Sequence, residues 1–226
     1  MLISHAKRFI FIHNPKAAGT TFRTAINPLH DDRVVYWGFV ENPFFQMRMD
    51  TAHLRSWEMP IVAPDIFSLM DDYRTLAFVR DPLERFLSAC AEFFRSARPQ
   101  SRFQHWPARG KRMLIQRLIR SGVIQSGVLA NYRYVHFSPQ VWFTHLGQRR
   151  IVRQIVHIRP GNDDLAEGFA YLGLPYVKVP PVNVTRNVDW SAVASQEIKD
   201  FVRSFYAQDY AMLAMLEPEL ARAGQG

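Results

Sequence analysis

The chain has 226 residues, of which 48% are hydrophobic and 21% charged, and its formal net charge is +8. These values exclude a largely disordered chain, and the length suits one α/β domain with a substantial core. The positive charge resides on 23 arginines and 5 lysines, so planar, bidentate donors suited to phosphate, sulfate or carboxylate predominate. The arginines are spread among apolar segments rather than gathered in one run, which disfavours a nucleic-acid surface.

Cysteine usage and hydropathy limit the class further. Cys90 is the only cysteine in the sequence, which excludes an intrachain disulfide and a cysteine-based zinc site. No apolar run approaches the roughly 20 residues of a membrane span. Because the first predicted strand is entered by Arg8, we expect no signal peptide or anchor and a cytoplasmic location.

The first strong signal is a strand followed by a short loop and a helix. Four consecutive apolar residues, Phe9 to Ile12, predict a buried strand of a parallel sheet. Asn14-Pro15 ends the strand. The loop Lys16-Ala17-Ala18-Gly19-Thr20-Thr21 then leads into a helix that we expect to reach Ile26.

This loop has the properties of an anion-binding site. Small residues let the backbone approach a ligand at a helix N-terminus, and Lys16 adds a cation. Thr20 and Thr21 can cap the helix and donate hydroxyl hydrogen bonds. The alternative interpretation is a tight turn with a capping threonine and an exposed lysine. Because lysine leads the loop and no glycine precedes it, the order Gly-x-x-x-x-Gly-Lys-Ser/Thr of magnesium–ATP kinases is absent.

The next segment contains a second predicted strand and an isolated histidine. Arg33 to Val40 is predicted as a strand or extended segment, and Glu41 to Ala52 as an irregular loop of the kind that carries sites. His53 follows this loop. Taken alone, it would be a surface residue or a structural hydrogen-bonding residue.

A second buried strand, Tyr73 to Arg80, ends on an arginine. Pro82 is well placed to begin a helix, whose apolar residues recur at helical spacing. Arg80 occupies the carboxyl end of its strand, where open α/β sheets bind ligands. A salt bridge to Asp81 or Glu84 is the alternative role for this arginine.

The rest of the chain is predicted to continue the same single domain, 1–226, with a frayed tail after about 221. The remaining predicted elements are a loop or lid from Arg95 to Arg112, a short helix Met113–Arg120, a strand Arg150–Ile158, a helix Asp163–Leu172, a loop Pro180–Asn187, and a long helix from Ser191 to Leu216 that ends before Pro218.

Two further histidines, His136 and His145, raise the question of a metal site. Their spacing matches no common zinc pattern, and no carboxylate lies near them in the sequence. We therefore expect no metal site.

Taken together, these motifs resemble those of sulfotransferases that use 3′-phosphoadenosine-5′-phosphosulfate (PAPS). Pro15 to Thr21 resembles the family's 5′-phosphosulfate loop, and Val79 to Ser88 its 3′-phosphate motif. His136-Phe137-Ser138-Pro139-Gln140 resembles the mid-domain phrase H-x-x-P-Q of the branch containing heparan sulfate 2-O-sulfotransferase and small bacterial sulfotransferases. Pro180–Asn183 and Tyr206–Tyr210 resemble its carboxy-terminal pattern. In one departure, His157 and Arg159 stand where relatives often carry a glutamate.

The resemblance implies a P-loop-like three-layer fold with a central, mainly parallel sheet flanked by helices. It also implies transfer of a sulfuryl group from PAPS to an acceptor hydroxyl on a carbohydrate or glycolipid, releasing the bisphosphate PAP without a metal. Lys16 would neutralise the leaving oxygen, and Ala18, Gly19, Thr20 and Thr21 would cradle the 5′-phosphate. Arg80 and Ser88 would bind the 3′-phosphate, with Arg186 as an additional contact.

An acceptor hydroxyl needs a base, and the resemblance favours His53, with His136 in reserve. We expect His13 to be a structural hydrogen-bonding residue. Two other functions are considered: an atypical nucleotide kinase and a non-catalytic polyanion-binding protein. The identity of the acceptor and the oligomeric state are left open.

Overall fold

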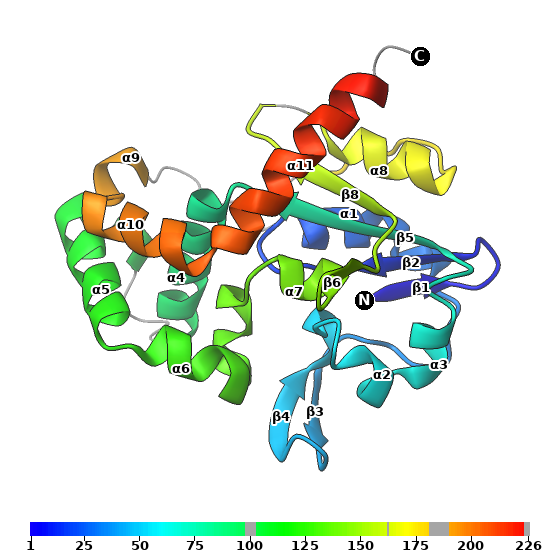
Figure 1. The fold of residues 1–226 in the computed structure, drawn as a ribbon, viewed down its shortest axis with the longest axis horizontal. Coiled ribbons are helices and arrows are strands. Elements are labelled where there is room, and N and C mark those ends of the chain that lie inside the picture. Colours follow the sequence, from blue (N-terminus) through cyan, green and yellow to red (C-terminus); the bar gives the residue numbers. More distant parts are fainter. Residues whose placement is uncertain (98–102, 162, 181–189, 224–226) are drawn as a thin grey trace.

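The computed structural model describes residues 1–97, 103–161, 163–180 and 190–223 (Figure 1). Its centre is a four-stranded sheet in the order β1-β2-β5-β8. β2 (Phe9–Ile12) runs parallel to β5 (Arg74–Arg80), β5 runs parallel to β8 (Gln154–Ile158), and β1 (Leu2–Ser4) is antiparallel to β2. The predicted α/β fold with a mainly parallel sheet is confirmed.

The described residues outside this sheet form two small hairpins and a set of helices. The hairpins are β3 (Phe39–Asn42) with β4 (Met47–Asp50), and β6 (His145–Leu146) with β7 (Arg149–Arg150). The α-helices are α1 (Gly19–Ile26), α2 (Met59–Val62), α3 (Pro64–Ser68), α4 (Pro82–Ala97), α5 (Ala108–Arg120), α6 (Val123–Ala130), α7 (Val141–Thr144), α8 (Leu165–Leu172), α9 (Trp190–Val193), α10 (Gln196–Phe205) and α11 (Ala207–Ala223). Short 3₁₀ helices are η1 (Asn27–Leu29), η2 (Thr51–His53), η4 (Phe103–His105) and η5 (Tyr132–Phe137).

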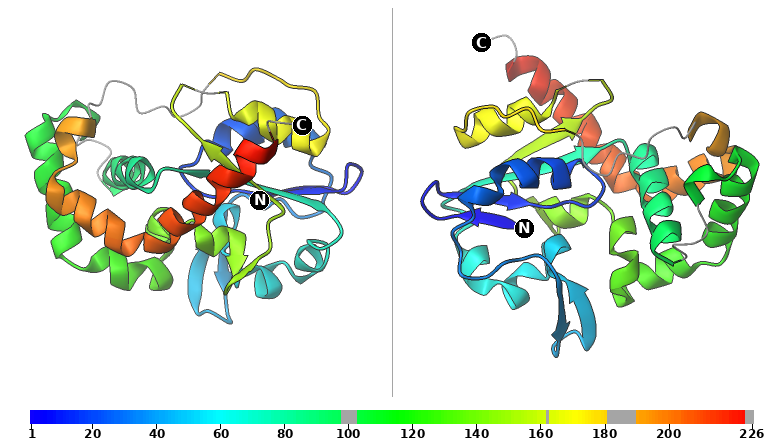
Figure 2. Two further views of the ribbon diagram at one scale, coloured as in Figure 1. Left: turned by 45° about the horizontal axis from the view of Figure 1, so that its top comes forward. Right: turned by 180° about the vertical axis from the view of Figure 1, so that it is seen from behind.

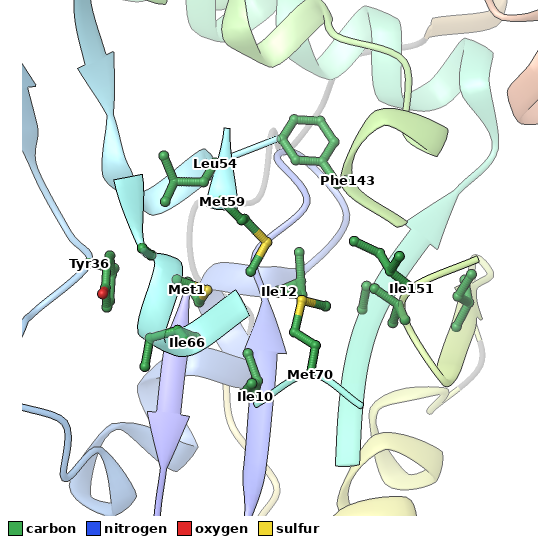
Figure 3. Packing of buried hydrophobic residues seen from close by; sticks show 14 of the residues in the cluster. Met1, Ile10, Ile12, Tyr36, Leu54, Met59, Ile66, Met70, Phe143 and Ile151 are labelled. Carbon is green, nitrogen blue, oxygen red and sulfur yellow. The ribbon is translucent and has the colours of Figure 1, made fainter. Parts of the chain in front are cut away.

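Successive side chains of β2 point to opposite faces of the sheet, so they contribute to two separate parts of the core. Phe9 and Phe11 pack with residues of α1 and α8, whereas Ile10 and Ile12 pack with residues of α2, α3, α7 and α11. The views in Figure 2 show α1 and α8 on one side of the sheet and α11 crossing the other. Figure 3 shows Met59, Ile12 and Met70 meeting on this second face. Both faces are therefore buried, as the continuous apolar run of β2 predicts.

A third hydrophobic cluster joins helices α4, α5, α6 and α10 beside the sheet. Figure 1 shows this helical lobe on the side of the molecule to which the carboxyl ends of β2 and β5 point. The lobe includes much of the segment that we predicted as a loop or lid. That prediction was wrong at both ends, because α4 continues to Ala97 and α5 already begins at Ala108.

Two further predictions need correction, and one strand was missed. Of residues 33–40, predicted as a strand or extended segment, only Phe39 and Val40 lie in a ladder, and they pair with β4 rather than with the central sheet. The edge beside β2 is occupied by β1. The sequence pattern did not predict β1, because this strand has only three residues. In 150–158, only Arg150 and residues 154–158 lie in strands.

The predicted long helix is divided into α9, α10 and α11. Ser195 is extended before α10, and Tyr206 leaves helical geometry after it. At the second break the buried Tyr206 hydroxyl donates to the Phe137 carbonyl at 2.8 Å, which ties the end of α10 to η5. The last helix continues past Pro218 to Ala223 instead of ending before the proline.

Candidate active site

The candidate site is a cavity of about 630 Å³ at the carboxyl ends of the parallel strands. Segments following β2 and β5 line it, together with Ile158 at the end of β8. This is the place at which open α/β sheets bind ligands. The sequence-predicted residues that line it are His53, Lys16, Ala18, Gly19, Thr20, Thr21, Arg80 and Ser88.

The loop after β2 has an unusual backbone. Lys16 and Ala18 both have positive φ values, 64° and 60°, in a region that non-glycine residues rarely occupy. α1 begins directly afterwards at Gly19, and Phe22 N–H donates to the Ala18 carbonyl at 3.3 Å. Helix geometry leaves the N–H groups before that bond without an intrahelical acceptor. A loop of this geometry at a helix N-terminus is suited to holding an anion.

Gly19 is required by the packing of His13 rather than by its own φ. A Cβ added at Gly19 would lie 2.2 Å from Cδ2 of His13. The His13 ring also stacks on Trp37, with centroids 5.5 Å apart and planes 5° apart. His13 lines the cavity but is buried, and burial lowers its pKa well below the usual value of 6.5.

Cationic side chains that line the cavity form ion pairs with glutamates of α4. Lys16 Nζ lies 3.6 Å from Glu92 Oε2, and Arg80 Nε donates to Glu84 Oε2 at 2.8 Å. Arg95 pairs with the same Glu92. Burial lowers the pKa of Lys16, and the Glu92 carboxylate opposes that shift. The alternative predicted for Arg80, a salt bridge to Glu84, is therefore present, in a cavity that the arginine also lines.

His53 is buried, not on the surface. Its Nδ1 lies 2.9 Å from the carbonyl oxygen of His13. Since a carbonyl only accepts, Nδ1 carries the proton and Nε2 keeps its lone pair. Burial lowers the pKa of His53 to about 4, and the Asp50 carboxylate opposes the shift.

His136, the reserve base, lies edge-on to His53 with ring centroids 5.1 Å apart. Burial lowers its pKa well below 6.5. In the part of the chain that the structure describes, Asp50, His53 and His136 form a group whose nitrogen and oxygen ligand atoms lie within 4.8 Å of one another. His145 does not line the cavity.

Arg186, the additional donor contact predicted from the resemblance, lies outside the described residues. Other residues that line the cavity were not predicted as site residues: Trp37, Phe39, Asp50, Glu92, Arg95 and Trp190, with Glu84 named only as an alternative partner of Arg80. The periodicity of α4 could have identified Glu84 and Glu92, because they stand four residues on either side of Ser88 and share its helix face.

A set of buried polar residues behind the cavity was also missed. Gln140 Oε1 accepts from Arg80 N–H at 2.8 Å, and Gln140 Nε2 donates to the Arg80 carbonyl at 2.8 Å. Asp209 in turn accepts from the N–H groups of Gln140 and Val141 at 2.9 and 3.0 Å. Gln140 and Asp209 thus join α7 and α11 to the end of β5. Both belong to phrases quoted for the resemblance, which gave them no role.

The fold and this site define an α/β protein that presents a lysine-containing loop and an arginine at adjacent strand ends. Comparison with known families gives the class: the sulfotransferase family model matches residues 1–214, and the chain belongs to that family. Searches of curated proteins and of solved structures each found no match. Within the described residues, no helix has the length and apolar character needed to cross a bilayer.

Proposed function

We propose that this protein transfers the sulfuryl group of PAPS to an acceptor hydroxyl. Family membership makes it a transferase of sulfuryl groups. The observation that carries the choice of donor is that Lys16, the loop 18–21, Arg80 and Ser88 line one cavity at the end of a parallel sheet. These are the positions at which the resemblance places the two phosphate-binding motifs of a PAPS enzyme, within a P-loop-like arrangement of strand, loop and helix.

The loop fits the 5′ end of such a donor. Positive φ values at Lys16 and Ala18 are typical of backbone segments whose successive N–H groups form a concavity for an anion. Ala18, Gly19, Thr20 and Thr21 would hold the 5′-phosphosulfate through N–H groups and the two hydroxyls. Lys16 would neutralise the bridging oxygen as negative charge develops there.

Arg80 and Ser88 fit the 3′-phosphate, which distinguishes PAPS from ATP. Both line the cavity, Arg80 from the end of β5 and Ser88 from α4. A guanidinium binds phosphate oxygens bidentately. Arg186 remains a proposed additional contact to the donor.

The reaction is an in-line displacement at sulfur, in which a bond from the acceptor oxygen forms as the bond to the phosphate oxygen breaks. His53 would accept the acceptor hydroxyl's proton on Nε2, because its Nδ1 proton is committed to the His13 carbonyl. With a pKa lowered to about 4, the imidazole is neutral at pH 7. Asp50 stabilises the imidazolium that forms. This scheme requires no metal.

For the acceptor we propose a carbohydrate or glycolipid. Phe39 and Trp190 line the cavity, and aromatic rings offer apolar faces on which a sugar can stack. The alternatives are less well supported. Family membership favours sulfuryl transfer over nucleotide phosphorylation, and Glu84 and Glu92 inside the cavity disfavour a non-catalytic polyanion-binding surface.

The donor site is tested by calorimetric titration with PAP and, separately, with ATP plus magnesium. We expect magnesium-independent binding of PAP that Arg80→Ala weakens. The matched control is Arg149→Ala, which removes an exposed arginine paired with Asp71 and should leave binding unchanged. Preference for magnesium–ATP would indicate a kinase, and no binding of either nucleotide would refute the PAPS proposal.

The role of Lys16 is tested by turnover with PAPS and a panel of saccharide and glycolipid acceptors. Lys16→Ala should lower the rate by at least the roughly 10²–10³-fold that loss of one such donor costs. Circular dichroism should show an intact fold. Wild-type turnover by this variant would refute the mechanism.

A further inference from the structure

Asp50, His53 and His136 come from three separate parts of the chain and meet at one wall of the cavity. Asp50 ends β4, His53 ends η2, and His136 lies in η5. One carboxylate oxygen and two ring nitrogens lie within 4.8 Å of one another. The sequence around His136 lacks a carboxylate, and folding supplies one from the β3–β4 hairpin.

We propose that these three side chains bind a divalent transition-metal ion such as Zn²⁺ or Co²⁺, and that the bound ion prevents His53 from acting as the base. Two imidazoles and one carboxylate select such ions over Mg²⁺ and Ca²⁺, which prefer oxygen ligands. The metal site itself stands on the geometry of the three residues, whereas the inhibition rests on the proposed function.

The orientation of His53 supports a ligand role. Its Nδ1 proton is donated to the His13 carbonyl at 2.9 Å, so Nε2 presents its lone pair. Histidine ligands are usually held by such a hydrogen bond from their second nitrogen to a backbone carbonyl or carboxylate. Asp50 is likewise held, because its Oδ1 accepts from Ala52 N–H at 3.0 Å. Two of the three ligands are therefore preoriented by the backbone.

The three ligand atoms would have to move only modestly closer together to bind one metal ion. In a tetrahedral zinc site, ligands at about 2.0–2.2 Å from the metal lie roughly 3.4 Å apart. The three atoms here span up to 4.8 Å, and a small rotation of the His136 side chain, which lines the cavity, would bring them closer together. Three protein ligands would leave a fourth position facing the cavity, which water or an acceptor oxygen could fill.

Metal binding and proton transfer compete for the same electron pair. The Nε2 lone pair of His53 can form a bond to the acceptor proton or to the metal, but not to both. The proposed donor-binding groups, Lys16, Arg80 and Ser88, are not among the metal ligands. Metal should therefore stop turnover while leaving PAP binding intact.

The site is tested on full-length, tag-free, chelator-treated protein by titration with Co²⁺, followed by visible absorption and by calorimetry. We expect one equivalent to bind and to produce the d–d absorption of a low-coordinate Co²⁺ site. Asp50→Asn should weaken binding by more than about 100-fold, beyond the roughly 10–100-fold that loss of an outer-shell partner costs. Failure of the wild-type protein to bind Co²⁺, or equal binding by Asp50→Asn, would overturn the proposal.

A matched control is available in the second His–carboxylate pair, His5 with Asp32, whose Nε2 and Oδ2 lie 2.9 Å apart outside the cavity. His5→Asn should leave Co²⁺ binding unchanged, and a loss of binding in this variant would place the metal elsewhere. PAP titration of the same samples separates the two proposals. Absent PAP binding with intact Co²⁺ binding would refute only the proposed donor, and the reverse result would refute only the metal site.

Discussion

The buried guanidinium of Arg85 holds the carbonyl of Pro15, the residue directly before Lys16. Arg85 Nε donates to the Pro15 oxygen at 2.9 Å, and its Nη2 donates to the Ser138 carbonyl at 2.8 Å. Arg85 is fully buried, and burial lowers its pKa although Tyr206 and Asp209 oppose the shift. One side chain of α4 thereby fixes the loop that carries the proposed catalytic lysine.

Replacing Arg85 should therefore affect both the fold and the donor site. Arg85→Lys keeps the charge but cannot reach both carbonyls with a planar fork. We expect a loss of about 2–4 kcal/mol in the free energy of unfolding, because buried carbonyls lose their donor. PAP affinity should fall at least tenfold at temperatures where the variant is folded. Urea unfolding and calorimetry measure the two effects, and unchanged values for both would contradict this role.

Gly19→Ala should be destabilising despite the better helix propensity of alanine. The propensity gain is about 1 kcal/mol, but the new Cβ would lie 2.2 Å from the His13 ring. The ring must move, and overpacking of this kind typically costs about 1–3 kcal/mol. We expect lower stability and weaker PAP binding, measured by urea unfolding and calorimetry.

Gly110→Ala provides the control for this prediction. Gly110 lies in α5, and the nearest atom to an added Cβ is 3.2 Å away on the Trp106 ring. This variant should be near neutral or slightly more stable, with unchanged PAP binding. Stabilisation by Gly19→Ala would show that the His13 ring is not confined as described.

Stability should decrease as the pH falls from about 6.5 toward 4. Burial lowers the pKa of His53 to about 4 and the pKa values of His13 and His136 well below 6.5. The unfolded chain thus binds more protons in this range, so acid favours unfolding, by about 3 kcal/mol from His53 alone. The urea midpoint should fall between pH 7 and pH 5. His53→Asn should reduce that pH dependence, and an unchanged slope would contradict the burial of a neutral imidazole.

Glu84→Gln should strengthen PAP binding. Arg80 Nε is paired with Glu84 at 2.8 Å, and a phosphate must compete with that carboxylate for the guanidinium. Removing the negative charge also lessens repulsion of the ligand. We expect a gain of about two- to fivefold in affinity by calorimetry, since a partly exposed pair contributes at most about 1 kcal/mol. Weaker binding would mean that Glu84 orients Arg80 for the phosphate.

Part of the candidate site could be predicted because the loop from Lys16 to Thr21 and the strand and helix on either side of it are contiguous in the chain. The strand Phe9–Ile12 and the helix ending at Ile26 were correctly predicted, since an apolar run, a breaker and a capping segment follow one another locally. Arg80 at the end of its strand was predicted for the same reason.

The remaining errors have tertiary causes. Whether residues 33–40 join the sheet depends on which strand occupies the edge of β2, and the structure gives that edge to β1. The breaks at Ser195 and Tyr206 and the meeting of Asp50 with His136 depend on contacts between distant segments. No local pattern encodes such contacts, so the continuous apolar periodicity after Ser191 predicted one helix.

The pairing of Gln140 with both backbone groups of Arg80, and the anchoring of Gln140 by Asp209, also determines the order in which the site can be assembled. Apart from Arg186, the residues proposed to bind the donor lie within the first 88 positions, so they are synthesised early. The backbone of Arg80 gains its hydrogen-bond partner only when Gln140 has been synthesised. Gln140 in turn gains its own partner only when Asp209 has been synthesised. A nascent or truncated chain lacking α11 would therefore contain every one of those groups without the framework that orients them. Binding of the nucleotide donor would therefore show that α11 has packed onto the rest of the fold.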